Sequence, residues 1–321
     1  MLFRSVTTRP TQGPRGRVYA ALQEGPTEAS VPAYLANQTI DTLEHYATVD
    51  KPFFVSCNFW GPHAPFRITN PHYDMYDPAD CDVWPNFQAP LDDKPRIVPR
   101  QGQTFDTGWM REDDLRGLIA RHYGYVTLID DQIGRILKKL EELGKLDETL
   151  IIYAADHGSA LGAFGMWDKG FGMYEHFWRV PMVFSHPSLT PGSNEAFVSL
   201  LDLAPTFVDV AGAEQPPRFE GHSLMPLLRG ETDGVRPKEM VFEHFGHQFP
   251  VWQRMVRTER YKYVYNPSDI DEFYDLDEDP WEMRNLADTV SEDLIEPMRQ
   301  TLRDHIQRTN DPIRGFARDT L

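Results

Sequence analysis

Two side chains that can bind a cation stand immediately after an apolar stretch, and an amine follows in the same glycine-rich segment. Asp156 and His157 succeed the largely apolar residues 149–155, and Lys169 lies thirteen positions beyond Asp156. Ligands of open α/β sheets bind beyond the carboxyl ends of the strands, so the pattern favours a cation and an anion bound side by side. The structural alternative is an aspartate that caps a helix, with a solvated histidine and lysine.

His63 follows a second apolar stretch. Residues 53–60 (FFVSCNFW) predict a buried strand, which ends in the rigid loop 61–65, Gly-Pro-His-Ala-Pro. This loop therefore also lies at the carboxyl end of a predicted strand, where α/β sheets place their ligands.

Composition limits the classes of partner. The formal charge of −17 makes nucleic-acid backbones and anionic membranes unsuitable partners, so an anionic substrate needs positive charge concentrated at one site. The two cysteines, Cys57 and Cys81, give neither a disulfide framework nor a thiolate metal cluster. No run of 18 apolar residues predicts a membrane span. The first residues contain no secretory apolar region, and periplasmic, extracellular and cytoplasmic locations all remain open.

Helices and strands alternate in the larger part of the chain. Residues 1–25 predict a loop or tail, 31–46 a surface helix, and 67–111 a long irregular but packed excursion. Apolar residues recur every three or four positions from Glu112 until Gly144 stops the helix. Further elements are the strand at 149–155, which we expect to be buried in a largely parallel sheet, a buried strand at 180–187 and an apolar helix at 198–211. This order predicts an α/β fold, with a mainly parallel or mixed sheet flanked by helices.

The C-terminal part has a different pattern. From about residue 240, short alternating segments separated by turns predict antiparallel strands, and residues 291–308 predict a helix that begins after Ser291. We therefore expect one main domain at 26–238 and a smaller C-terminal α+β subdomain at 239–321.

Five segments, taken in order, resemble the sulfatases of the alkaline-phosphatase superfamily, and most closely the iduronate-sulfatase-like branch. They are PFFVSCNFWGPHAPF, YVTLIDDQIGRILKKLEELGKLDETLIIYAADHG, GMWDKG with RVPMVF, LLDLAPTFVDVAG with GHSLMPLL, and RTERYKYVYN with DEFYDLDEDPWEMRNLA. The likeness extends from about residue 31 to the end of the chain. It implies an alkaline-phosphatase-like fold and hydrolysis of a small sulfated substrate, a sugar or aryl sulfate.

The resemblance implies a role for four side chains. Asp156 and His157 match two of the family's metal ligands, Lys169 matches a lysine that contacts sulfate, and His63 matches a histidine near the leaving oxygen. The implied metal is calcium, although a histidine ligand leaves magnesium open. Lys⁺, imidazole donors and a divalent cation would stabilise the charge that develops on sulfate oxygens.

The family's nucleophile motif is absent. A formylglycine arises from the first residue of Cys/Ser-x-Pro/Ala-x-Arg, and neither Cys57, Cys81 nor any serine begins that motif. In the family, the first metal-binding pair of aspartates follows a strand. No such strand is predicted before the three adjacent aspartate pairs of this sequence, Asp92-Asp93, Asp113-Asp114 and Asp130-Asp131. We expect an N-terminally incomplete sulfatase, inactive alone. The alternatives are a phosphodiesterase or phosphonate hydrolase of the same superfamily, and a non-catalytic binding protein.

Overall fold

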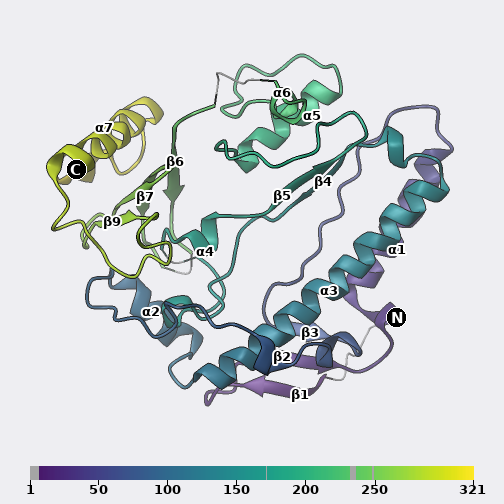
Figure 1. The fold of residues 1–321 in the computed structure, drawn as a ribbon, viewed down its shortest axis with the longest axis horizontal. Helices are drawn as coiled ribbons and strands as arrows, with labels where there is room; N and C mark the ends of the chain where they lie inside the picture. The colour runs from purple at the N-terminus through teal and green to yellow at the C-terminus, as the bar shows by residue number, and fades with distance from the viewer. Residues whose placement is uncertain (1–6, 171, 232–235, 248) are drawn as a thin grey trace. The chain divides into compact units, whose positions relative to one another are not determined.

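The computed structural model describes residues 7–170, 172–231, 236–247 and 249–321 (Figure 1). The chain divides into two units, each described by itself below. Unit 1 consists of three segments: Met1–Gln88, Pro99–Thr149 and Ser159–Asp168. Unit 2 consists of the other three: Ala89–Val98, Leu150–Gly158 and Lys169–Leu321.

Unit 1 contains a three-stranded sheet in the order β1-β2-β3, where β1 is Thr7–Gln12, β2 is Val18–Gln23 and β3 is Phe66–Ile68. β1 pairs antiparallel with β2, and β2 pairs parallel with β3. The prediction of a loop or tail over residues 1–25 was therefore wrong for residues 7–25, and residues 1–6 lie outside the described residues. As the central strand, β2 buries Tyr19 and its two following alanines completely, and this tertiary packing is not visible in the local pattern.

Two helices of unit 1 pack along each other, α1 (Val31–Ala47) and α3 (Glu112–Glu142) (Figure 1). Both confirm their predicted ranges. The Ser30 hydroxyl accepts a hydrogen bond from the Ala33 amide and caps α1, whereas Gly144 follows α3 at φ +67°, in the left-handed region that ends helices.

The excursion predicted to be irregular over 67–111 is packed, as expected, but it also contains ordered elements. These are the end of β3, two short 3-10 helices (η2, His72–Asp74, and η3, Pro78–Asp80) and α2 (Ile97–Phe105). Tyr73 and Phe87 are buried, which confirms that aromatic residues pack this part of the chain.

Residues 53–60 form no assigned strand, contrary to the prediction of a buried one. Their side chains alternate between half-buried and exposed, and Phe54 and Trp60 are each 68% exposed. The alternation is that of an extended chain, but no described residues pair with the segment as a neighbouring strand. Cys57, within this segment, is accordingly only half-buried.

The strand of unit 2 that precedes Asp156 is β4 (Ile151–Ala154), and it pairs antiparallel with β5 (Met182–Ser185). Both strands were predicted, but the expectation that they are buried, with β4 in a largely parallel sheet, was wrong. Tyr153 is 44% exposed and Val183 56% exposed. Within the described residues the sheet has these two strands alone. The exposed side chains of Tyr153 and Val183 are cross-strand neighbours and alternate with half-buried ones.

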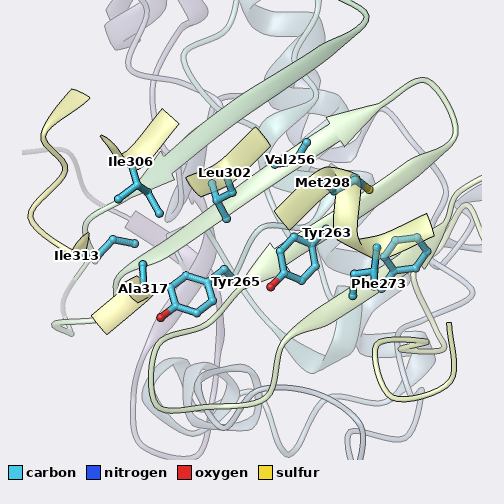
Figure 2. Packing of buried hydrophobic residues seen from close by; sticks show 10 residues of the cluster. Val256, Tyr263, Tyr265, Phe273, Met298, Leu302, Ile306, Ile313 and Ala317 are labelled. Atoms are coloured by element: carbon cyan, nitrogen blue, oxygen red, sulfur yellow. The ribbon is translucent and has the colours of Figure 1, made fainter. Parts of the chain in front are cut away.

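The C-terminal part of unit 2 is a four-stranded antiparallel sheet in the order β6-β7-β8-β9, as predicted. Its strands are β6 (Glu239–His244), β7 (Gln253–Thr258), β8 (Tyr261–Tyr265) and β9 (Glu272–Asp275). The helices α7 (Glu292–Thr309), which follows Ser291 as expected, and α8 (Arg314–Thr320) pack on it. Figure 2 shows this core, in which Met298, Leu302, Ile306, Ile313 and Ala317 meet Val256, Tyr263, Tyr265 and Phe273.

Three short helices complete unit 2: α4 (Glu175–Trp178), α5 (Leu203–Val210) and α6 (Met225–Leu228). The helix predicted over 198–211 is shorter, and Pro205 lies in the first turn of α5, where a proline is tolerated. No helix among the described residues has the length and apolarity to traverse a bilayer. Mixed sheets with helices and a C-terminal antiparallel sheet are the fold class expected from the sequence, whereas the domain boundary between 238 and 239 stays a prediction.

Candidate active site

Asp156 and His157 lie directly after β4 and face each other. The His157 amide donates to Asp156 Oδ1 at 3.0 Å, and His157 Nε2 is 3.7 Å from Asp156 Oδ2. The Asp156 side chain is 90% exposed and the His157 side chain 33% exposed. Gly158 allows this turn because a side chain there would collide with the His176 carbonyl oxygen, 2.0 Å from the Cβ position.

The backbone sets the tautomer of His157. Its Nδ1 is 2.8 Å from the Gly158 carbonyl oxygen, so Nδ1 carries the proton and donates it there. The lone pair of the neutral ring is then on Nε2, on the side of the Asp156 carboxylate. Histidines that bind metals are commonly oriented by such a hydrogen bond from the other ring nitrogen.

These two side chains fit a pair of metal ligands but do not complete a metal site. Calcium takes six to eight oxygen ligands, and magnesium requires near-octahedral geometry. No group of three or more histidine, cysteine, aspartate or glutamate side chains that could hold a metal ion occurs among the described residues. The described residues therefore do not complete a metal site, and the metal-binding role of Asp156 and His157 stays a prediction.

His63 lies in unit 1, in the loop that follows the extended residues 53–60. Its Nδ1 is 2.6 Å from the Ala64 carbonyl oxygen, and its ring centroid is 4.9 Å from that of Trp60. Gly61 is required two residues earlier, because a Cβ there would be 2.6 Å from the Tyr125 ring. The loop therefore packs closely against α3 at Gly61, and this packing fixes the backbone from which the His63 side chain extends.

An acidic partner of His63 was missed in the sequence. The Asp168 Oδ1 atom is 3.8 Å from His63 Nε2, and the two side chains are 13% and 22% exposed. Asp168 has φ +64°, a left-handed conformation that aspartate tolerates better than most residues. Its position directly before Lys169 could have drawn attention to Asp168, but nothing in the sequence indicated its contact with His63.

Backbone hydrogen bonds and side-chain packing both stabilise the loop that leads to Asp168. The Ala160 amide donates to the Asp168 carbonyl at 2.8 Å, and the Trp167 ring, 2% exposed, packs edge-on against Tyr19 with centroids 5.3 Å apart. The buried Gln101 amide group accepts from the Trp167 N–H at 3.0 Å and donates to the Trp167 carbonyl. Trp167 thus packs the loop.

Lys169 is half-buried and is the residue at which the chain passes from unit 1 into unit 2. Asp156 and His157 belong to unit 2, and His63 and Asp168 to unit 1. The structure therefore brings together two pairs, Asp156 with His157 and His63 with Asp168. That His63, Lys169, Asp156 and His157 share one pocket stays a prediction.

Comparisons with known proteins agree with this arrangement of elements. The model of the family described as Sulfatase matches residues 7–213, and that of N-sulphoglucosamine sulphohydrolase, C-terminal, matches residues 162–309. A choline-sulfatase of Rhizobium meliloti is 31% identical over 80% of this chain and 51% of its own length. A Δ4,5-hexuronate-2-O-sulfatase of Bacteroides thetaiotaomicron is 29% identical over 93% of this chain and 63% of its own length.

Among solved structures, the phosphonate monoester hydrolase of Silicibacter pomeroyi superposes with a TM-score of 0.80 at 26% identity. The match covers 93% of this chain and 64% of that protein. The chain spans about half the length of the curated choline-sulfatase that it matches. Since the Sulfatase model covers 207 of the 321 residues (7 to 213), the chain belongs to the sulfatase family.

Proposed function

We propose that this chain is the sulfate-binding part of a sulfatase-family hydrolase of sulfate esters, and that it does not turn over substrate by itself. The observation that carries the proposal is the match to the sulfatase model over residues 7–213, because this range includes His63, Asp156, His157 and Lys169. The relatives named above act on a choline ester and a hexuronate sulfate by their names. A small sulfated sugar or aryl sulfate is the proposed substrate class.

The chemistry of a sulfate ester suits the proposed residues. Attack at sulfur moves negative charge onto the equatorial oxygens and the leaving oxygen, and fixed cationic or N–H donors lower the barrier. In this proposal the Lys169 ammonium contacts a sulfate oxygen and the His63 imidazole lies near the leaving oxygen. The His63 backbone contact to Ala64 and the adjacent Asp168 carboxylate keep the ring in one orientation.

The missing nucleophile limits what the chain can do. The family's formylglycine precursor motif, Cys/Ser-x-Pro/Ala-x-Arg, does not occur in the 321 residues, so no covalent step has an attacking group. The proposed metal is Ca²⁺, with Mg²⁺ as the alternative, and Asp156 and His157 are proposed as two of its ligands. Two ligands hold such an ion weakly, because most of its coordination shell remains water.

The first test measures turnover and metal binding. We expect no hydrolysis of an aryl sulfate above background with Ca²⁺ or Mg²⁺ present, and no rise in the unfolding temperature when either ion is added at millimolar concentration. Robust metal-dependent hydrolysis by this chain would contradict the proposal. A large Ca²⁺-induced stabilisation that Asp156→Asn abolishes would instead show that the cation site is complete.

A second measurement tests sulfate binding without turnover. Mass spectrometry after brief acetylation reports the reactivity of the Lys169 amine, which bound sulfate should protect while sodium chloride of equal ionic strength should not. Equal reactivity in both salts would remove Lys169 from the proposed site. Lys238, a lysine on the same unit, serves as an internal reference.

Phosphonate monoester hydrolysis is the second candidate, and it is favoured by the structural match to the Silicibacter pomeroyi enzyme. Both ester types present tetrahedral oxyanions, so the same amine could bind either. Competition between sulfate and phenylphosphonate for protection of Lys169 distinguishes them. Protection by neither anion would favour the third candidate, a non-catalytic protein on the same fold. The absence of the nucleophile motif also supports this candidate.

A further inference from the structure

A cluster of fully buried charged side chains lies beneath the segment that follows Lys169. Lys262 on β8 and Glu282 beyond β9 are both 0% exposed, and the Lys262 ammonium contacts Glu282 Oε1 and, at 3.0 Å, Glu175 Oε1. Glu175 is the first residue of α4, six positions after Lys169. All these residues belong to unit 2.

The cluster binds the backbone of this segment as well as its side chains. Lys262 Nζ donates to the Met173 carbonyl oxygen at 2.9 Å, and the Glu175 amide donates to Glu282 Oε2 at 2.9 Å. Between these two contacts, the Tyr174 hydroxyl donates to the buried Glu272 carboxylate on β9 at 2.7 Å. Three consecutive residues are thus each held by a different charged group of the C-terminal part.

Two glycines between Lys169 and this anchor pack closely against other residues of unit 2. Gly170 and Gly172 both have φ +94°. A Cβ on Gly170 would be 2.6 Å from the His247 ring, and one on Gly172 would be 2.7 Å from the Tyr174 ring. Only glycine accommodates such close packing at positive φ. Met173 follows Lys169 by four positions, and an extended chain spans at most about 3.6 Å per residue, so a fixed Met173 limits where Lys169 can lie.

Stability alone does not account for this cluster. Burying an ion pair costs desolvation that its attraction often fails to repay, and apolar replacements of similar volume are frequently as stable. Burial, helped by the neighbouring Glu175 charge and opposed by the Lys262 ammonium, raises the pKa of the Glu282 carboxyl to about 7. Burial would also raise the pKa of Glu175, but Lys262 and Arg257 outweigh it and lower that pKa. One ammonium therefore serves two carboxylates.

We propose that Lys262 and Glu282 are positioning residues, which fix the backbone of residues 173–175 and thereby aim the Lys169 amine at the sulfate. The inference rests on the proposed role of Lys169 in binding sulfate. It gives the C-terminal antiparallel sheet a function in the site, because this sheet carries the ammonium that holds the Met173 carbonyl. It also gives a physical role to Glu282 within the C-terminal pattern shared with the family.

The test compares two double variants of the 321-residue chain. Lys262→Met with Glu282→Gln removes the two charges together, so neither is left buried and unpaired, but it abolishes the donor to Met173. The matched control is Arg254→Met with Asp311→Asn. Arg254 and Asp311 form a fully buried pair, with Nε and Oδ2 2.6 Å apart, that involves β7 of the same sheet. Among the described residues, the side-chain hydrogen bonds of this pair go to His244, Gln253 and Ile313, and none goes to residues 169, 170 or 172–175.

Two readouts are needed. Hydrogen exchange followed by mass spectrometry reports local opening of residues 169–178, and acetylation reports sulfate protection of Lys169. In the Lys262/Glu282 variant we expect faster exchange in this segment, and about tenfold or more weaker protection, because the sulfate must then order the amine itself. In the control we expect both readouts to equal those of the unmodified chain, apart from any uniform change in exchange.

Each outcome decides one statement. Unchanged exchange of residues 169–178 in the Lys262/Glu282 variant, or an equal loss of protection in both variants, overturns the positioning role. If the unmodified chain shows no sulfate protection of Lys169, the proposed binding role of Lys169 fails. Exchange in the segment then still decides whether Lys262 and Glu282 anchor it. The single variant Glu282→Gln, which keeps an acceptor for the Glu175 amide, should give an intermediate result.

Discussion

His122 is a histidine held neutral inside unit 1. It lies on α3 with its ring centroid 5.2 Å from that of Phe66, and burial lowers its pKa to about 4. An unfolded histidine has a pKa near 6.5, so between about pH 4 and 6.5 the unfolded chain binds the proton that the folded chain refuses. The stabilisation from a neutral His122 is therefore complete above pH 6.5, and is lost as the pH falls toward 4.

His122→Phe should remove this part of the pH dependence. In the unmodified chain the free energy of unfolding should fall by up to about 3 kcal/mol from His122 as the pH is lowered from 7 to 4. Denaturant titrations at several pH values measure the slope, and the phenylalanine variant should be flatter. His45→Gln on the exposed face of α1 is the control. His176, whose pKa burial also lowers to about 4, keeps some slope in every variant. Equal slopes for the His122 variant and the unmodified chain would refute the interpretation.

At the scale of residues, the sequence indicated which side chains are candidates for the site better than it indicated which residues contact them in the fold. Asp156 and His157 could be paired in advance because they are adjacent and follow a recognisable strand. The approach of Asp168 to His63 could not, since the two are distant in sequence and meet only when loops fold. The same holds for Gln101, which contacts the Trp167 backbone rather than its side chain.

The long helix α3 shows how one element carries different constraints along its length. Gly124 packs against η2, and a Cβ there would be 2.1 Å from the His72 carbonyl oxygen. Gly134 on the same helix has open space around it. Helix propensity favours alanine at both positions, but tertiary packing opposes it at the first.

Alanine replacements on α3 should therefore have opposite effects. Gly134→Ala should stabilise unit 1 by up to about 1 kcal/mol, through the better helix propensity of alanine. Gly124→Ala should destabilise it by about 1–3 kcal/mol, because the His72 backbone must move away. Denaturant midpoints of the two variants measure the difference. A stabilised Gly124→Ala variant would mean that η2 does not pack on α3 in solution.

The periodic elements were the ones that the sequence predicted well. The ranges of α1, α3 and α7 follow from repeated apolar spacing and from Ser30, Gly144 and Ser291 at their ends. The stretch 53–60 has an equally apolar sequence, but a strand exists only if a neighbour supplies hydrogen bonds, and that depends on other parts of a chain. The pairing direction of β4 was unpredictable for the same reason.

At the scale of the whole molecule, several large apolar side chains are exposed to solvent. Phe54 and Trp60 stand on the exposed side of an extended segment, and Leu35, Tyr46 and Phe54 help line a groove of about 470 Å³ between that segment and α1. Extended chain without a paired neighbour is a template for association with other chains.

We expect the chain to self-associate as its concentration rises, and Phe54→Lys with Trp60→Lys to reduce this. Added charge on exposed extended chain opposes edge-to-edge pairing. Sedimentation velocity over a range of concentrations measures the effect. Phe316→Lys on α8, where the aromatic side chain is 57% exposed, is the control and should leave association unchanged. If the unmodified chain stayed monomeric at all concentrations, residues 53–60 would not mediate self-association.

The shared ammonium of Lys262 has an evolutionary consequence. Replacement of this lysine alone would leave the fully buried Glu282 carboxylate without its ammonium and beside Glu175, which would keep only Arg257 as a counter-charge. A lineage that loses one member should therefore soon lose another. Across related proteins, positions 175, 262 and 282 should thus co-vary as a triplet. Positions on the exposed face of α7 should drift independently of them.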